Sequence, residues 1–166
     1  MPVVGLISDT HGLLRDEALR ALDGCDLIVH AGDVGKPEIL EALKALAPLV
    51  AVRGNIDKGA WASALPVTAV AQAGRVAIYV LHDVHQLDLD PAAARFQVVV
   101  SGHSHQPARR EQSGVLFLNP GSAGPRRFKL PVTVARLDLE RKPWEVKFIQ
   151  LDSSHDRPGV LSHVLP

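Results

Sequence analysis

The stretch that decides the fold is Val3-Val4-Gly5-Leu6-Ile7-Ser8-Asp9-Thr10-His11-Gly12. Its apolar, β-branched start predicts a buried strand. The polar residues that follow end at a glycine, so Asp9 and His11 lie close together at the C-terminal edge of that strand. Carboxylate and imidazole ligands together suit manganese, iron, zinc, cobalt or nickel better than calcium or magnesium. For this pair alone, an aspartate that caps the next helix beside a surface histidine is an equal alternative.

Two further strand-and-helix units follow the first strand. Apolar spacing and proline positions predict a helix over 14–22, a strand over 26–30, a helix from Pro37 to before Pro48 and a strand over 49–53. The strand over 26–30 leads into Asp33, and the strand over 49–53 leads into Asn55 and Asp57. Ligands in open α/β sheets collect outside the carboxyl ends of the strands. These polar turns are therefore candidates for one shared site.

From about residue 60 the helical period gives way to strand signals. The expected elements are strands over 67–73, 76–81, 98–100, 108–112, 115–118, 132–139 and 144–151, with a short helix around 91–95. His82 follows the strand over 76–81, and His103 and His105 follow the strand over 98–100. The chain is expected to form a single domain over 1–166, in which 152–166 is a polar C-terminal tail with two solvent-facing histidines, His155 and His163.

The composition limits the classes of function. A chain of 166 residues can bury a substantial core. Lys and Arg together number 18, as do Asp and Glu, so no basic field attracts nucleic acid or a membrane surface. The single cysteine, Cys25, lies in an apolar setting and is expected to be a small buried hydrophobe. No apolar run approaches the ~20 residues of a membrane span, and the expected location is the cytoplasm.

Seven strand-end residues have side chains suited to two adjacent divalent cations with one bridging carboxylate. They are Asp9, His11, Asp33, Asn55, His82, His103 and His105. Single members have plain alternatives: Asp33 and Asn55 are also common turn residues, and a lone histidine such as His82 is more often a hydrogen-bonded interior residue. Their joint occurrence at five strand ends favours the metal interpretation.

The ordered motifs resemble those of the calcineurin-like metallophosphoesterases, especially their small single-domain bacterial and archaeal phosphodiesterase branch. They are Asp9-x-His11, Gly32-Asp33, Gly54-Asn55-x-Asp57, His82, Gly102-His103-Ser104-His105 and Asn119-Pro120-Gly121-Ser122, within a resemblance from residue 3 to about 150. The resemblance implies an α/β fold, a β-sandwich flanked by helices on both outer faces. It also implies hydrolysis of a small phosphodiester by two cations ~3.5–4 Å apart that hold a bridging hydroxide.

Carried onto this sequence, the resemblance implies two ligand sets. Asp9, His11 and His105 would bind one metal, Asn55, His82 and His103 the other, and Asp33 would bridge them. The cofactors expected are two divalent transition-metal ions, manganese first, with nickel, cobalt, iron and zinc as alternatives. The expected partner is a small phosphoester, without extended nucleic acid or membrane, and a homodimer is left open.

Two departures from the family pattern concern the general acid. Small members often have a His-Gly-His run where this chain has His82-Asp83-Val84-His85, so the second histidine is displaced. Larger relatives place a histidine after the asparagine ligand, where this chain has Ile56. His85 and Asp57 are the remaining candidates for catalytic roles. Asp57 is also placed to orient a ligand such as His11, and His30 is expected to pack behind the site.

Three alternatives to a phosphodiesterase remain. The same fold serves as a non-catalytic scaffold in a membrane-trafficking coat whose metal positions are degraded, whereas all seven ligand positions here carry competent side chains. A phosphomonoesterase or a nuclease would differ only in substrate. The lack of basic patches argues against long nucleic acid.

Overall fold

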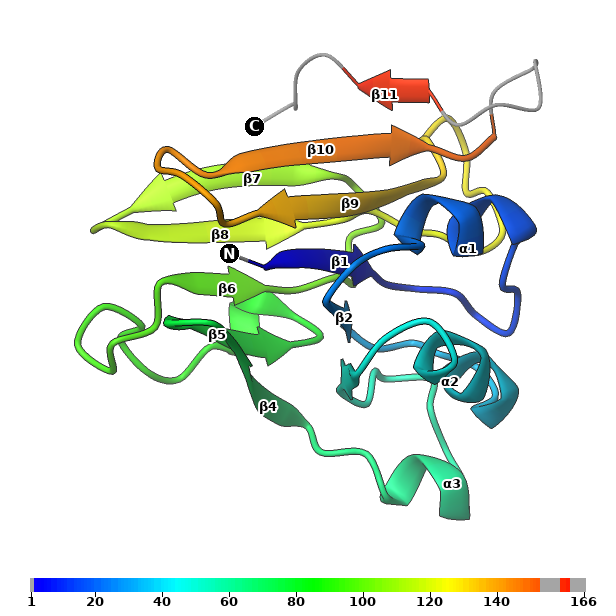
Figure 1. Ribbon diagram of the computed structural model, residues 1–166. Coiled ribbons are helices and arrows are strands. Elements are labelled where there is room, and N and C mark those ends of the chain that lie inside the picture. The colour runs from blue at the N-terminus through cyan, green and yellow to red at the C-terminus, as the bar shows by residue number, and fades with distance from the viewer. Residues whose placement is uncertain (1, 153–158, 162–166) are drawn as a thin grey trace.

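The computed structural model describes residues 2–152 and the strand at 159–161, and shows two packed β-sheets (Figure 1). The first sheet contains, in spatial order, β11 (Gly159–Leu161), β10 (Glu145–Gln150), β9 (Thr133–Asp138), β1 (Val3–Ile7), β2 (Leu27–His30) and β3 (Leu49–Ala51). The second contains β4 (Thr68–Ala73), β5 (Val76–Leu81), β6 (Val98–Val100), β8 (Val115–Asn119) and β7 (Ala108–Gln112). This arrangement is the α/β sandwich that the sequence predicts.

Parallel pairing fixes which strand ends lie together. β1 pairs in parallel with β2, and β2 with β3, so their carboxyl ends share one edge of the first sheet. In the second sheet, β5, β6 and β8 are likewise parallel neighbours. The crossovers between parallel neighbours are long, as this pairing requires. Each strand that precedes a predicted ligand therefore points its carboxyl end to the same edge of its sheet.

The core between the sheets comes from alternate residues of the strands, because successive side chains of a strand point to opposite faces. Val4 and Leu6 of β1 belong to the same buried cluster as Val80 of β5 and Val100 of β6. Ile7 of β1 points to the other face of the first sheet, where it belongs to a second buried cluster. The inner cluster holds the two sheets together.

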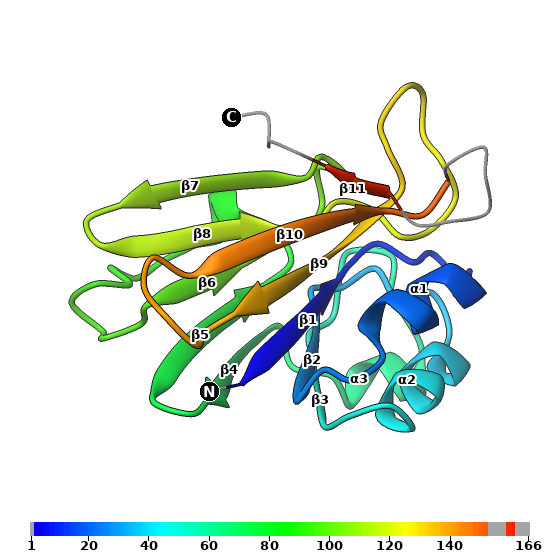
Figure 2. The same cartoon turned by 45° about the horizontal axis from the view of Figure 1, so that its top comes forward.

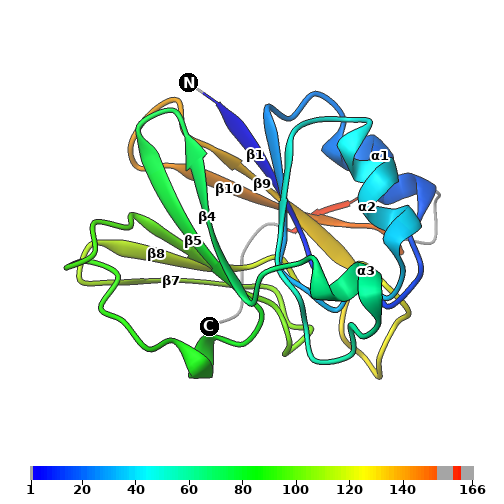
Figure 3. The same ribbon diagram turned by 90° about the horizontal axis from the view of Figure 1, so that it is seen from below.

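Three helices cover the outer face of the first sheet (Figures 2 and 3). They are α1 (Asp16–Leu22), α2 (Pro37–Lys44) and the short α3 (Ala60–Ser63). Leu22 and Leu43 are fully buried there, and Trp61 of α3 packs against the same cluster. Cys25 lies in this layer too, as expected of a small buried hydrophobe, and burial raises the pKa of its thiol. Among the helices of the described residues, none has the length and hydropathy to cross a membrane.

The outer face of the second sheet is covered differently. Tyr79, Leu81 and Val99 form a small cluster with partly buried residues between β5 and β6. The ring of Phe96 lies 5.1 Å from that of Tyr79. The one helical element in this cover is the 3-10 turn η1 (Val84–Gln86). The expected helices on both outer faces are therefore found on the first sheet only; among the described residues, the outer face of the second sheet is covered by the segment between β5 and β6.

The predicted strands all form, with ends that shift by at most two residues, whereas the short elements differ from expectation. The helix expected around 91–95 is wrong: these residues form a turn that ends at Arg95, whose φ is 67°. Neither α3 nor η1 was expected, because four or fewer residues carry no period. The expected C-terminal tail contributes β11, and His155 and His163 lie outside the described residues.

Candidate metal centre

The strand ends of the two sheets bring the seven predicted ligands together in two adjoining groups, each with members from both sheets. Asp9 and His11 follow β1, Asp33 follows β2, Asn55 follows β3, His82 follows β5, and His103 and His105 follow β6. Asp9, Asp33, His82 and His105 are buried, although they are charged or strongly polar. Such side chains are buried in proteins only when they are paired or hold a metal.

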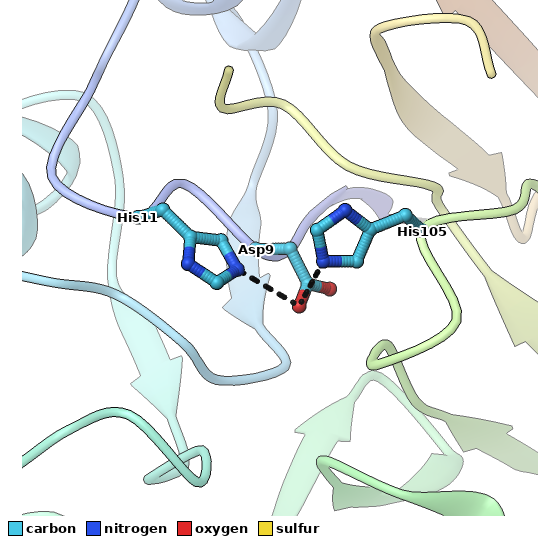
Figure 4. Close-up of side chains that lie close together, drawn as sticks. All are labelled: Asp9, His11 and His105. Atoms are coloured by element: carbon cyan, nitrogen blue, oxygen red, sulfur yellow. Dashed lines mark ion pairs between the residues drawn. The ribbon is translucent and has the colours of Figure 1, made fainter. Parts of the chain in front are cut away.

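The first group consists of Asp9, His11 and His105 (Figure 4). The Nε2 atoms of His105 and His11 lie 3.3 and 3.7 Å from Asp9 Oδ1. Asp9 Oδ1 and His11 Nε2 are buried and have no hydrogen-bond partner. Buried polar atoms without hydrogen-bond partners are costly, and a cation between the carboxylate and the imidazoles would remove that cost.

The second group adjoins the first through Asp33. Its Oδ2 atom lies 3.4 Å from His11 Nε2 and 3.3 Å from His82 Nε2, which places one oxygen between the two imidazoles. Asp9 Oδ1 also faces His82 Nε2, but at the longer distance of 3.9 Å. Asp33 is therefore better placed than Asp9 to bridge the two groups.

Asn55 and His103 complete the second group. One side-chain amide atom of Asn55 lies 3.0 Å from His82 Nε2 and 3.2 and 3.3 Å from the Asp33 carboxylate oxygens. An amide oxygen there faces only acceptors, an arrangement that a cation resolves. His103 Nδ1 lies 3.3 Å from His82 Nε2, although the His103 side chain is 48 % exposed. The donor set thus fits two transition-metal ions.

Hydrogen bonds behind the ligands fix their orientation. His82 Nδ1 donates to the carbonyl oxygen of Ala31 at 2.8 Å, which leaves Nε2 free to bind a metal. The hydroxyl of Ser8 donates to Asp9 Oδ2 at 2.6 Å. The sequence interpretation did not single out Ser8, because a serine before an aspartate has no distinctive spacing.

His30 lies behind the site and is fully buried, as expected for packing. The backbone N–H of Gly32 donates to His30 Nδ1 at 3.1 Å, so His30 Nε2 carries the proton and donates to Thr10 Oγ1 at 3.0 Å. Burial lowers the pKa of His30 to about 4. His30 is therefore a neutral spacer that links the turns after β1 and β2.

Asp57 has a different role from the expected one. Its carboxylate accepts hydrogen bonds from the backbone N–H groups of Val34, Gly35 and Gly54, at 3.1, 2.9 and 2.9 Å. The expectation that it orients the His11 ring is wrong, because the N–H groups of two tight turns occupy both of its oxygens. Asp57 instead ties the turn after β2 to the turn after β3.

The backbone at the site is unusual. Five of the proposed ligands have positive φ: Asp9 at 56°, His11 at 48°, Asp33 at 56°, His103 at 72° and His105 at 64°. This conformation costs non-glycine residues of order 1–3 kcal/mol each and persists where the surroundings impose it, typically at functional sites. Two glycines permit the close packing: a Cβ on Gly54 would collide with Asp33, and one on Gly102 with Ser8 and Asp9.

The carboxylates are ionised at neutral pH. Burial alone would raise the pKa of Asp9, but contacts with His105 and other donors outweigh it and hold that pKa well below its usual range. Burial likewise opposes ionisation of Asp33, and His82 outweighs it and lowers the pKa. Both proposed ligands are therefore anionic.

The candidates for a general acid lie outside this cluster. The side chain of His85 is 89 % exposed, and its Nδ1 lies 3.1 Å from Asp83 Oδ1. Asp83 Oδ2 is in turn 3.9 Å from His103 Nε2, so His85 is separated from the ligands by another side chain. Ile56 contributes its backbone N–H, which donates to Asp33 Oδ1 at 3.1 Å.

Two cavities have the proposed ligand His103 in their walls, and both are lined by Asp83 as well. One, of about 180 Å³, extends toward Ala108, Arg110 and Phe117. The other, of about 320 Å³, includes Asn55, His82 and Arg53. Both cavities therefore adjoin the proposed second-metal ligands.

The sandwich and its cluster of carboxylates and imidazoles at aligned strand ends define a metal-binding phosphoesterase architecture. The chain belongs to the calcineurin-like phosphoesterase superfamily, whose domain model matches residues 3–142. The chain thus falls within the metallophosphoesterase family, which suggests a hydrolase.

Three curated archaeal relatives resemble most of the chain. It is 32 % identical to a probable metallophosphoesterase of Methanothermobacter thermautotrophicus, covering 87 % of this chain and 91 % of that protein. It is 34 % identical to a probable metallophosphoesterase of Methanocaldococcus jannaschii, with coverage of 90 % and 82 %. A phosphodiesterase of the latter organism is 24 % identical, with coverage of 85 % and 95 %.

Solved structures share the fold. Vps29 of Entamoeba histolytica, complexed with Zn²⁺, superposes with a TM-score of 0.74 and 22 % sequence identity, covering 96 % of this chain and 98 % of that one. At this identity the likeness shows the fold alone.

Proposed function

We propose that this protein is a dinuclear, metal-dependent phosphodiesterase that acts on small phosphodiesters. The observation that carries the proposal is the position of Asp33 Oδ2 between His11 and His82, next to the unpartnered buried oxygen of Asp9. Asp9 Oδ1 and His11 Nε2 have no hydrogen-bond partner among the described residues, and two cations would satisfy them.

Each ligand set has a role in this proposal. Asp9, His11 and His105 hold one ion, Asn55, His82 and His103 hold the other, and Asp33 contacts both. When bound, such ions supply an activated water as nucleophile and stabilise the phosphoryl oxygens. Manganese is the first candidate, with nickel, cobalt, iron and zinc as alternatives, and the cytoplasm is the proposed location.

The protein's own groups prepare this site before substrate arrives. Ala31 fixes the His82 ring, and Asp57 fixes the two turns that present Asp33 and Asn55. Preorganised ligands of this kind need no rearrangement during the reaction. Neither sequence candidate for a general acid is held at the cluster: His85 is 89 % exposed beside Asp83, and the Asp57 carboxylate accepts three backbone N–H groups.

Two observations favour a diester over a monoester. A phosphodiester carries two substituents, and two cavities have His103 in their walls. The curated relative that is 24 % identical is a phosphodiesterase. The proposed partner is accordingly a small phosphoester. Formation of a homodimer stays a prediction.

The competing function is a non-catalytic scaffold. Vps29 is a vacuolar protein sorting protein by name, and its fold matches this one. The specific feature against a scaffold is the strained backbone of five ligand positions, since a docking surface does not require left-handed residues that point carboxylates and imidazoles at one another.

The test is a substrate screen of the purified protein after reconstitution with Mn²⁺, Co²⁺, Ni²⁺ or Zn²⁺. Phosphodiesters, cyclic nucleotides and phosphomonoesters are compared, with and without EDTA. We expect diester hydrolysis that is lost on chelation and restored by metal. Full activity in metal-free protein refutes the proposal, and a metal-loaded protein that cleaves none of these esters supports the scaffold.

A further inference from the structure

The smaller cavity beside His103 has a composition suited to a specific kind of group. It lies between the segments that follow β5 and β6 and the strands β7 and β8. Phe117 and Ala108 supply apolar wall, and Arg110 adds a planar cation whose guanidinium carbon lies 4.1 Å from the centre of the Phe117 ring. The exposed Arg110 side chain also donates from Nη1 to Gln112 Oε1 at 2.6 Å.

The main buried amide of this cavity is already satisfied. Asn119 Nδ2 donates to the carbonyl oxygen of Gly102 at 2.9 Å and to Ser104 Oγ at 3.1 Å. Asn119 Oδ1 accepts from the N–H of Gly121 at 2.9 Å. Asn119 therefore has little capacity left for a sugar or an alcohol. An apolar, planar occupant can instead pack against Phe117 and gain a cation–π contact with Arg110.

The volume of the cavity further limits which groups can occupy it. An apolar cavity of about 150 Å³ holds a benzene molecule, and this one measures about 180 Å³. A single aromatic ring fills such a space. The cavity is small for a fused ring system or a long alkyl chain.

The cavity adjoins the proposed metal centre. His103 forms part of its wall, and His103 Nδ1 lies 3.3 Å from His82 Nε2. A phosphorus atom at the metal centre is therefore one side chain away from the cavity. That separation suits a ring attached directly to an ester oxygen.

We propose that the cavity formed by Ala108, Arg110 and Phe117 binds a monocyclic aromatic substituent of the phosphodiester. The inference rests on the proposed function and names a substrate class for the same site: diesters with at least one aryl group. The aromatic group is selected by packing, while the phosphate is selected by the metal centre.

The experiment compares phenylphosphonate with methylphosphonate, whose carbon–phosphorus bonds ester hydrolysis does not cleave. Calorimetry on the Mn²⁺-loaded protein measures both affinities. We expect phenylphosphonate to bind roughly tenfold more tightly, the factor that 1.4 kcal/mol of aromatic packing gives. Phe117→Ala should reduce this preference to about twofold or less.

Two further variants sharpen the test. Ala108→Leu fills the cavity without removing a core side chain and should also abolish the preference. Phe128→Ala removes an aromatic ring that is 95 % exposed in another loop and serves as the matched control, with the preference intact. Thermal melts establish that each variant is folded.

The possible results separate the inference from the proposed function. Equal affinities in the wild type overturn the inference, as does a preference that survives in folded Ala108→Leu protein. If the protein hydrolyses diesters but shows no preference for the aromatic ring, the proposed aryl-binding cavity is refuted and the phosphodiesterase function is supported. Ring preference without hydrolysis of any diester supports the cavity and refutes the phosphodiesterase.

Discussion

At the scale of single residues, one oxygen of Asp33 has the position on which the dinuclear site depends. Its Oδ2 atom is nearly equidistant from His11 Nε2 and His82 Nε2, at 3.4 and 3.3 Å. A carboxylate in that place neutralises charge at both proposed ions, whereas each imidazole serves one. The two types of ligand should therefore respond differently to removal.

We predict that Asp33→Ala loses both metal ions, whereas His82→Ala retains about one per chain, because Asp33 Oδ2 lies next to ligands of both proposed ions and His82 belongs to one set only. Metal content measured by atomic absorption after gel filtration checks this. The control is Asp16→Ala, which removes an exposed carboxylate from α1. Equal metal content in Asp33→Ala and His82→Ala would show that Asp33 is not the bridge.

The exposed position of His85 leads to a second prediction at this scale. A general acid within reach of the leaving group contributes 10²–10⁴-fold in rate, and a side chain that is 89 % exposed beside Asp83 is not so placed. We expect kcat/KM to fall steeply as the pKa of the leaving group rises. His85→Ala should leave that slope unchanged.

The measurement is a series of diesters that share one substituent and differ in leaving-group pKa, on the wild type and on His85→Ala. A flat series in the wild type contradicts the absence of an acid. A slope that becomes steep only in His85→Ala identifies His85 as the acid and restores the sequence interpretation.

At the scale of elements, the sequence predicted the strands and their ends well because both signals are local. Alternating or continuous apolar runs indicated β1, β2 and β6. The polar turns after these strands indicated Asp9, Asp33 and His103 as candidate ligands. Periodicity fails for elements of four or fewer residues, which is why η1 and α3 were missed. The turn at 91–95 was misjudged for the same reason.

The features that the sequence could not predict are those that depend on the order of strands in the sheets. The cavity beside His103 exists because β8 pairs with both β6 and β7, which brings Phe117 next to Arg110. In the sequence these are an ordinary strand phenylalanine and a surface arginine. The role of Asp57 was predicted wrongly for the same reason. Its hydrogen-bond partners come from the turns after β2 and β3, and these turns lie close together only because the two strands pair in the sheet.

At the scale of the whole molecule, the proposed ligands join the two sheets. Asp9, His11, Asp33 and Asn55 follow strands of the first sheet, whereas His82, His103 and His105 follow strands of the second. Ions held at this place connect the sheets at one end of the sandwich. Without them, the buried carboxylates of Asp9 and Asp33 face each other across a small volume.

We therefore predict that metal binding stabilises the whole fold and not just one loop. A free metal concentration about 100 times the dissociation constant should add about 2.7 kcal/mol. For a domain of this size that corresponds to roughly 5–10 °C in Tm. Differential scanning calorimetry with Mn²⁺ and with EDTA measures the shift, as a single transition in both states if the sheets unfold together. Asp16→Ala should show the wild-type shift, and Asp33→Ala should show little or none, because the ions then have no shared ligand. A wild-type Tm that is the same with metal and with chelator contradicts the prediction, since any ligand that binds only the folded state must raise it.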